Sequence, residues 1–377
     1  PGSRTIDEEG VLFENFRLVE GGCFREEALR AALTAGPNPA RNPDQNIADL
    51  KAQVAANEKG LHELHAMIEH FGIHSVQAYM RHVRANAESA VRAIIDRIGN
   101  GAMTIDLDNG ASICVRIEVD HTQREVLVDF TGTSPQSESN FNAPVSVTRA
   151  AVLYVFRTLI AEQIPLNAGC LAPIRLQIPA GCLLNPVPPA AVVAGNVETS
   201  QCITNALYGA LGVMAAGQCT MNNLTFGNDR LQYYETICGG SGAGPDFDGT
   251  AAVHTHMTNS RMTDPEVIET RYPVLIRAFG IRRGSGGQGR HCGGDGVYRQ
   301  IEFLAPMTVA ILSNNRREGP FGLDGGDSGQ AGSNLVRRRD GTVQAVDSVE
   351  ELMLEVGDTL IIETPGGGGY GSAQSVN

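Results

Sequence analysis

Residues 231–264 read LQYYETICGGSGAGPDFDGTAAVHTHMTNSRMTD, a Gly-rich segment that runs into a stretch with histidine at alternate positions, His254 and His256. Successive side chains of a β-strand point to opposite faces, so a strand over 253–258 would place both imidazoles on one face. An amide, Asn259, and a guanidinium, Arg261, follow at once. This stretch combines a flexible backbone with four chemically useful side chains, and we predict that a functional site is built on it.

The composition excludes several classes of protein. Of the 377 residues, 42% are hydrophobic and 19% charged, which is the balance of a globular chain. The net charge of −13 argues against nucleic acid as a partner. The 44 glycines follow no G-x-y period, which excludes collagen and indicates many tight turns. No apolar run approaches the roughly 20 residues of a membrane span, so we expect no membrane partner.

The eight cysteines indicate a reducing environment. None of them form a C-x-x-C pair, so zinc-finger chemistry is excluded, and a chain of this size needs no disulfide framework. We therefore expect reduced, mostly buried thiols and a cytoplasmic location. The chain opens at Pro1 without a methionine, in the middle of a pattern, and we expect further sequence before it.

The hydrophobic pattern changes from helical to strand-like near residue 100. Apolar residues at helical spacing predict helices over 43–71 and 73–98, and the short link between them predicts an antiparallel hairpin. His62 and His65 share a face of the first helix; a metal pair is one interpretation, and solvated surface histidines are the one that the spacing favours. From residue 102 the period is two, which predicts strands. A helix over 147–161, apolar almost all round, interrupts them.

These patterns predict an α+β fold in which a helical hairpin packs beside a β-rich body with a buried central helix. Residues 1–100 form an N-terminal extended segment and the hairpin, and residues 101–377 form the body with its Gly-rich loops.

Three further features are candidates for ligand binding. Ala194-Gly195-Asn196 precede a helix to about residue 216; the free N–H groups of a helix start suit an anion, and an ordinary capped helix is the alternative. Residues 284–289 fit G-x-G-x-x-G, but no clear strand precedes them and no helix follows, so we exclude a dinucleotide site. The four glycines at 366–369 form either a flexible tail or a backbone that passes close to a ligand.

Many long motifs, spread over the whole chain, resemble those of the hydantoinase B/oxoprolinase family. They include SRTIDEEGVLFENFRLV (3–19), VDFTGTSPQ (128–136), AAVVAGNVETSQ (190–201), YYETICGGSGAG (233–244), VHTHMTNSRMTDPEVIETRYP (253–273) and TPGGGGYG (364–371).

The resemblance implies one half of an ATP-dependent enzyme that opens a cyclic amide. An A-type partner half, as a subunit or a fused domain, would bind ATP and Mg²⁺ and phosphorylate the amide oxygen, and this B-type half would add water. The first expected substrate is 5-oxoproline, with glutamate as the product. The alternatives are a hydantoin, a caprolactam-like ring or a ketone that related subunits carboxylate, or a non-catalytic scaffold for the A-type half. The resemblance also implies an oligomer, and a divalent metal whose ligands are expected in a segment upstream of this chain.

This chemistry requires an activated water and a stabilised oxyanion. We expect His254 or His256 to act as acid or base, and Asn259 to take part in catalysis. Substrate contacts are expected from a larger set of amide, glycine and guanidinium groups: Asn142, Gly195, Asn196, Asn223, Gly239, Gly240 and Arg261.

Overall fold

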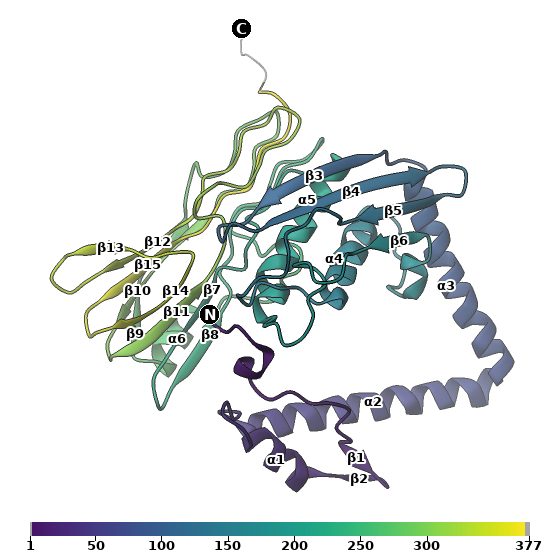
Figure 1. Cartoon of the computed structure of the whole chain (residues 1–377), viewed down its shortest axis with the longest axis horizontal. Helices are drawn as coiled ribbons and strands as arrows, with labels where there is room; N and C mark the ends of the chain where they lie inside the picture. Colours follow the sequence, from purple (N-terminus) through teal and green to yellow (C-terminus); the bar gives the residue numbers. More distant parts are fainter. Residues whose placement is uncertain (1, 374–377) are drawn as a thin grey trace.

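The computed structural model describes residues 2–373 and confirms the α+β class. Figure 1 shows an arm of helices, a sheet with helices against it, and a body of further sheets. The arm starts with η1 (Ile6–Glu9), the short hairpin of β1 (Val19–Glu20) and β2 (Cys23–Phe24), and α1 (Glu26–Thr34). Here α1 packs on the start of α2 (Pro43–Phe71) through a small core of its own: Leu29, Leu33 and Ile47.

The two long helices form an open V. Both α2 and α3 (Ile73–Ile95) meet at Gly72, which ends α2 with a φ of +79°, a conformation that suits glycine. The antiparallel packing that we predicted is wrong, because the helices diverge from this elbow (Figure 1). Only the C-terminal half of α3 enters the body, where Val91 and Ile95 are fully buried. Along α2 the apolar stripe stays open, with Phe71 60% exposed.

The first large core lies between a sheet and two helices. Strands β3 (Gly101–Asp106), β4 (Ser112–Asp120) and β5 (Glu125–Asp129) run antiparallel, and β6 (Ile174–Gln177) joins β5 in parallel. The predicted central helix is α4 (Val145–Thr158), with Val152, Val155 and Phe156 fully buried. Beside it lies α5 (Ser200–Leu211), in which almost every side chain is buried, the polar ones included. This helix therefore carries polar groups into the interior.

The second large core is a sandwich of two sheets. The first sheet has the order β14 (Val349–Leu354), β11 (Met307–Leu312), β7 (Asn223–Gly227) and β8 (Gln232–Glu235), all antiparallel. The second has the order β13 (Val343–Ala345), β12 (Ser333–Arg337), β15 (Thr359–Glu363), β10 (Val297–Phe303) and β9 (Val274–Ile281). Phe226 and Val309 of one sheet and Ile301 and Leu360 of the other belong to one buried cluster.

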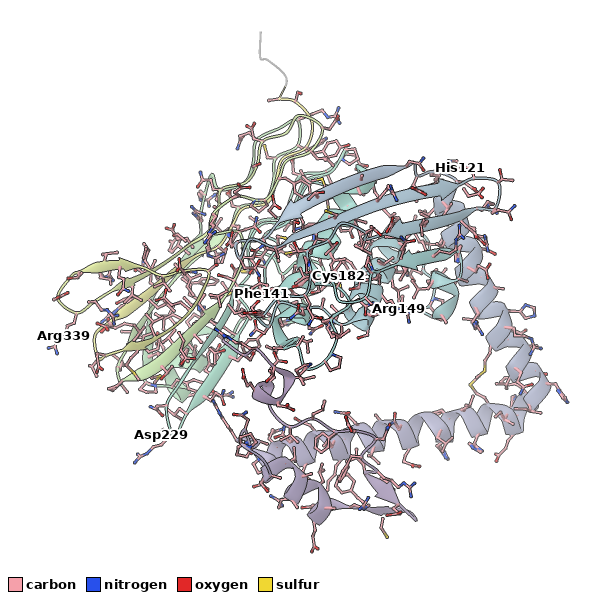
Figure 2. All side chains as sticks on the ribbon, viewed as in Figure 1. His121, Phe141, Arg149, Cys182, Asp229 and Arg339 are labelled. Carbon is pink, nitrogen blue, oxygen red and sulfur yellow. The ribbon has the colours of Figure 1, made fainter. Side chains whose placement is uncertain are left out.

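Hairpin turns and a short helix complete this half. Figure 2 shows Asp229 at the outer end of the β7–β8 hairpin and Arg339 at the far edge of the second sheet. A short helix, α6 (Pro265–Arg271), precedes β9, and its N-cap Asp264 accepts a hydrogen bond from Glu266 N. Within residues 2–373, none of the helices combines the length and the apolar character that crossing a bilayer requires.

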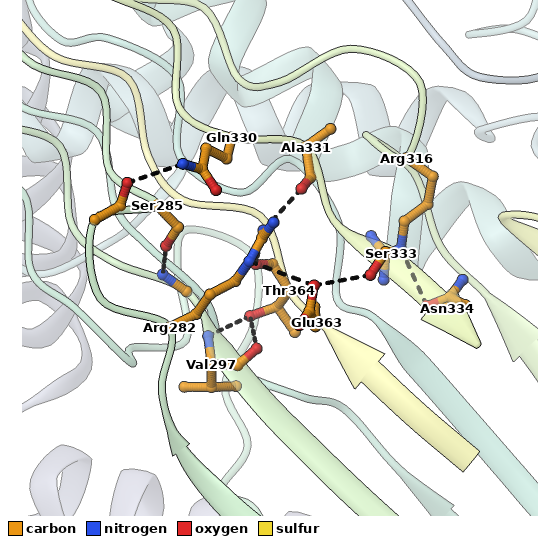
Figure 3. Close-up of polar contacts among 12 residues, drawn as sticks. Arg282, Ser285, Val297, Arg316, Gln330, Ala331, Ser333, Asn334, Glu363 and Thr364 are labelled. Atoms are coloured by element: carbon orange, nitrogen blue, oxygen red, sulfur yellow. Dashed lines mark hydrogen bonds and ion pairs between the residues drawn. The ribbon is translucent and has the colours of Figure 1, made fainter. Parts of the chain in front are cut away.

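The Gly-rich segments pack against one another, backbone on backbone. A Cβ on Gly367 would lie 1.9 Å from Ser241 O, and one on Gly368 would lie 1.9 Å from Phe321 O. The run at 366–369 is therefore not a flexible tail: it is buried, and its neighbours are other loops. The close approach to a ligand stays a prediction. Polar side chains fix this layer, as Figure 3 shows: Thr364 Oγ1 accepts from Val297 N at 2.8 Å.

Candidate active site

A π-helical turn leads into the most buried helix of the molecule. Residues Gly195–Thr199 form η3, and α5 follows without a break. Single π turns inside helices occur frequently at functional sites. Gly195 is required here because a Cβ would lie 2.2 Å from Asn142 O, so only glycine lets the turn pass the neighbouring loop. The close backbone approach at Gly195 is therefore made to another loop, and the predicted substrate contact stays a prediction.

The π turn carries a fully buried carboxyl group, Glu198. Its Oε1 accepts from Thr220 Oγ1 at 2.9 Å, from Met221 N at 3.0 Å and from Asn223 Nδ2 at 2.7 Å. Burial raises the pKa of Glu198 to about 8, although these hydrogen bonds and the charge of Arg316 act in the opposite direction. A pKa of about 8 favours the neutral form of Glu198 at pH 7, and all three hydrogen bonds are accepted by Oε1. Among the described residues, Oε2 has no hydrogen-bond partner.

A relay of hydrogen bonds connects Glu198 to a cavity. Tyr234 Oη donates to Asn223 Oδ1 at 2.7 Å, and Asn223 Nδ2 donates to Glu198. The two relay residues come from the paired strands β7 and β8. The cavity has a volume of about 290 Å³. Its lining joins the N-terminal segment, the π turn and the first sheet of the sandwich: Ser3, Glu9, Asn140, Val193, Val197, Asn223, Thr225, Tyr234, Ala310 and Leu312.

The helix start near Gly195, which we considered as an anion site, is occupied by the carboxylate of Glu9. The carboxylate of Glu9 accepts from Val192 N at 3.0 Å and from Val193 N at 2.9 Å, and also from Ser3 Oγ at 3.1 Å. These N–H groups begin the helical segment that contains the π turn, where a negative charge is favourable. Asn196, in the next turn, is exposed and its carbonyl accepts from Ser200 Oγ. A substrate carboxylate at this helix start would have to displace Glu9.

The predicted strand over 253–258 is wrong. Val253 forms one isolated bridge with Gly239, and the chain then turns, with Thr258 N donating to Thr255 O. The reason is local: His256 has a φ of +52°, which a β-strand does not allow. The alternation of histidines therefore belongs to a tight turn, which packs against α5.

The turn is attached to α5 by a buried amide. Gln201 Nε2 donates to Thr255 O at 3.1 Å and to Thr258 Oγ1 at 2.7 Å. The ring of His256 packs 5.2 Å from that of Tyr208 and 6.0 Å from that of Tyr154, centroid to centroid. Gln201 lies one turn after Glu198 on the same helical segment, so α5 contacts both the relay and the histidine turn.

Both histidines are neutral at physiological pH. Burial lowers the pKa of His256 to about 4 and lowers the pKa of His254 as well. Within the part of the chain that the structure describes, neither ring nitrogen of His254 has a hydrogen-bond partner, and Nε2 of His256 has none. An unpartnered buried nitrogen is costly, so such a group is a candidate for a ligand or a proton.

The remaining predicted residues fall into two groups. Asn142 uses its whole side-chain amide for hydrogen bonds to the backbone: Oδ1 accepts from Ser137 N, and Nδ2 contacts three backbone carbonyls. Gly239 and Gly240 are also packed internally, since a Cβ would lie 2.0 Å from Gln218 Oε1 and 1.9 Å from Gly294 O respectively. The second group, Asn259 and Arg261, is exposed on the segment after the histidine turn.

Our sequence reasoning missed three residues of this site: Glu9, Glu198 and Tyr234. A signal existed for Glu198, because it is the one charged residue between 190 and 219, and a charged side chain is rarely buried in a helix without partners. The paired tyrosines at 233 and 234 offered another, since they point to opposite faces of β8: Tyr233 is 7% exposed and Tyr234 is 52% exposed. No local signal pointed to Glu9, because its partners lie 183 residues away.

The described residues do not form a metal centre. Between residues 2 and 373, no three His, Cys, Asp or Glu side chains converge so as to hold a metal ion. His62 and His65 are both exposed on α2. The residues present therefore do not fit the expected divalent metal, and no step below passes through one.

The profile of the Hydantoinase B/oxoprolinase family matches residues 1–373, and the chain belongs to this family. The relative 5-oxoprolinase 1 of Arabidopsis thaliana is 46% identical over 398 residues, which cover 99% of this chain. The chain spans only 31% of that relative's length.

Two solved structures share the fold. The ATP-dependent caprolactamase from Pseudomonas jessenii superposes with a TM-score of 0.82 at 23% identity, over 98% of this chain and 69% of that one. A nucleotide-free acetone carboxylase gives a TM-score of 0.83 at 16% identity, over 98% and 58% of the two chains.

Proposed function

We propose that this chain is the B-type, hydrolytic half of an ATP-dependent cyclic amide hydrolase, and that its substrate is 5-oxoproline, opened to glutamate. The observation that carries the proposal is the small cavity above the relay of Tyr234, Asn223 and Glu198. The cavity has an apolar wall and a buried acid at the end of its relay, which suit a small ring. The two histidines do not line the cavity; they lie on the turn that Gln201 of α5 holds. The 46% identity to a 5-oxoprolinase supports this choice of ring.

The proposed roles follow from which groups are still able to accept or donate. Adding water to an activated ring carbon requires a base for the water's proton. His254 is our candidate, since it is neutral and both of its nitrogens lack a partner among the described residues. His256, more deeply buried between tyrosine rings, supports the turn and stays neutral. Asn259 is proposed to donate its amide to the oxyanion that forms at the ring carbon.

The carboxylate of 5-oxoproline needs a cation, and among residues 2–373 neither a lysine nor an arginine lines the cavity. We assign this contact to Arg261, which is exposed two residues after Asn259. The same lack of a cation favours a second candidate, a ring without a carboxylate, such as a caprolactam or a hydantoin. Competition between 5-oxoproline and 2-pyrrolidinone, which differ only in the carboxylate, discriminates between the two.

A partner would supply the ATP. We propose that an A-type, ATP-binding half completes the enzyme, since the chain accounts for 31% of the matched 5-oxoprolinase. We place the contact with this half on the V-shaped arm, where Phe71 and Tyr79 are 60% and 72% exposed near the elbow. Changing Tyr79 to Asp should then weaken co-purification of the two halves. The eight free cysteines are in keeping with a cytoplasmic, reducing location.

The experiment that tests the function combines this chain with an A-type half, ATP, Mg²⁺ and 5-oxoproline, and measures glutamate. We expect glutamate only when both halves are present. His254→Gln should lower kcat by about 10²–10⁴ if His254 is the base. The matched control is His121→Gln in the exposed turn between β4 and β5, which belongs neither to the arm nor to the cavity lining and should leave the rate unchanged. Full activity of His254→Gln would refute the assigned role, and absence of glutamate from the intact mixture would refute the function.

A further inference from the structure

The hydrogen atoms around Asn223 can be assigned without ambiguity. Asn223 Nδ2 donates to Glu198 Oε1 at 2.7 Å and to the carbonyl oxygen of Leu312 at 2.8 Å. A carbonyl oxygen only accepts, so this side of the amide must be the NH₂ group, and Oδ1 must be the atom that faces Tyr234. Asn223 Oδ1 cannot donate, and the hydrogen bond of 2.7 Å therefore uses the single proton of Tyr234.

The oxygen of Tyr234 is consequently an acceptor toward the cavity. A phenol has one proton, and once it is committed to Asn223 only lone pairs remain for a ligand. Donating to a polarised amide also makes this oxygen a better acceptor, because hydrogen bonds in a chain strengthen one another. Glu198 anchors the far end of the chain, so the polarity of Tyr234 is set by a residue that does not line the cavity.

The N-terminal part of the cavity lining also presents acceptors. Ser3 Oγ donates to Glu9 Oε1 at 3.1 Å and accepts from Asn140 Nδ2 at 3.1 Å, so its proton is also spent. Glu9 itself, as a carboxylate, only accepts. Apolar side chains such as Val197 supply the remaining wall. Thr225 and Asn140, which can also donate, complete the lining. A ligand that reaches Tyr234 therefore needs a hydrogen-bond donor at that point, beside an apolar ring.

We propose that Tyr234 is a specificity-determining residue that accepts a hydrogen bond from the ring N–H of a cyclic amide, a donor that the ring carries before its oxygen is phosphorylated and again once water has added to the ring carbon. The ligand class rests on the function proposed above; the polarity rests only on the hydrogen bonds of Asn223, Glu198 and Leu312. The cavity selects rings that carry N–H over rings of the same shape that carry oxygen or N-methyl at that position. Its volume, about 290 Å³, suits a ring of five to seven members.

Binding of small probes to the full chain tests this selection directly. The probes are 2-pyrrolidinone, with a ring N–H, γ-butyrolactone, with oxygen in its place, and N-methyl-2-pyrrolidinone. We expect 2-pyrrolidinone to bind about tenfold more tightly than the other two, as one net hydrogen bond provides. Tyr234→Phe should reduce the ratio to about one. Tyr233→Phe is the matched control, because Tyr233 is buried on the other face of β8 and donates to Glu235. Equal affinity for all three probes overturns the inference.

A second measurement covers the case in which Tyr234→Phe frees Asn223 Oδ1 to accept the N–H itself. In wild-type protein labelled with ¹³C at tyrosine Cζ, addition of 2-pyrrolidinone should shift the Tyr234 signal, and γ-butyrolactone should not. An unshifted signal under saturating 2-pyrrolidinone overturns the inference. If the assembled enzyme forms glutamate but the probes show no N–H preference, the inference fails and the proposed function stands. If no cyclic amide is opened while the preference persists, the proposed function fails and the assignment of Tyr234 stands.

Discussion

Replacing Glu198 by glutamine should change how stability depends on pH. Burial raises the pKa of Glu198 from its ordinary 4.5 to about 8. Between these values the native protein keeps a proton that the unfolded chain has released, so the unfolding free energy falls as pH rises. The slope is about 1.4 kcal/mol per pH unit, which totals about 5 kcal/mol between pH 4.5 and 8. Glu198→Gln mimics the neutral acid and cannot titrate.

The measurement is chemical unfolding of both proteins at several pH values from 5 to 9. We expect the unfolding free energy of Glu198→Gln, relative to that of the wild type, to rise by about 1.4 kcal/mol per pH unit up to pH 8. Above pH 8 the difference between the two proteins should stay constant. Glu63→Gln is the control, since Glu63 is exposed on α2 and its surface pair with Lys59 contributes little. Parallel curves for Glu198→Gln and wild type would refute the raised pKa and, with it, the neutral acid in the relay.

Three further changes test the packing of the body. Arg299 Nε and Glu235 Oε1 form an ion pair of 3.0 Å, and both side chains are buried. Glu235→Ala leaves the guanidinium buried without a partner and should lower the unfolding free energy by about 3–5 kcal/mol in chemical unfolding. A loss below about 1 kcal/mol would contradict this reasoning. Gly367→Ala should destabilise strongly because the methyl group meets a carbonyl oxygen at 1.9 Å, whereas Gly60→Ala, in the open middle of α2, should raise the melting temperature slightly. Burial lowers the pKa of His256 to about 4, so the unfolded chain binds a proton first as pH falls below 6.5 and the native state loses stability. Between pH 6.5 and 4 the unfolding free energy of His256→Gln should therefore fall by about 3 kcal/mol less than that of the wild type. An identical fall in both proteins would contradict the lowered pKa.

Helices and strands could be predicted where the hydrophobic period was long and its ends were marked. The helix over 43–71 is an example: Asn42 caps it by accepting from Gln45 N, and Gly72 ends it. The same pattern could not show that the helix would stand away from the body. An apolar stripe predicts a buried face without naming what covers it, and in residues 2–373 much of this stripe stays exposed.

The prediction of a strand over 253–258 failed for a different reason. Alternation over a few residues is equally compatible with a strand and with a turn, and a left-handed φ at His256 has no signature in a residue that is not glycine. The contact of Glu9 with Val192 and Val193 joins segments 183 and 184 residues apart, which no local pattern can encode. Such contacts had to come from the structure, and they decide which predicted groups are still available to a ligand.

The two asparagines that we predicted as substrate contacts illustrate this limit. Asn142 and Asn223 are both almost fully buried. Asn142 directs every donor and acceptor at the backbone of its own loop and of residue 191, so it holds the loop in place. Asn223 directs its NH₂ group inward and its oxygen at Tyr234, which turns toward the cavity. Residue type and burial are nearly equal in the two cases; the hydrogen-bond partners differ, and only the second chain ends at a side chain, Tyr234, that lines the cavity.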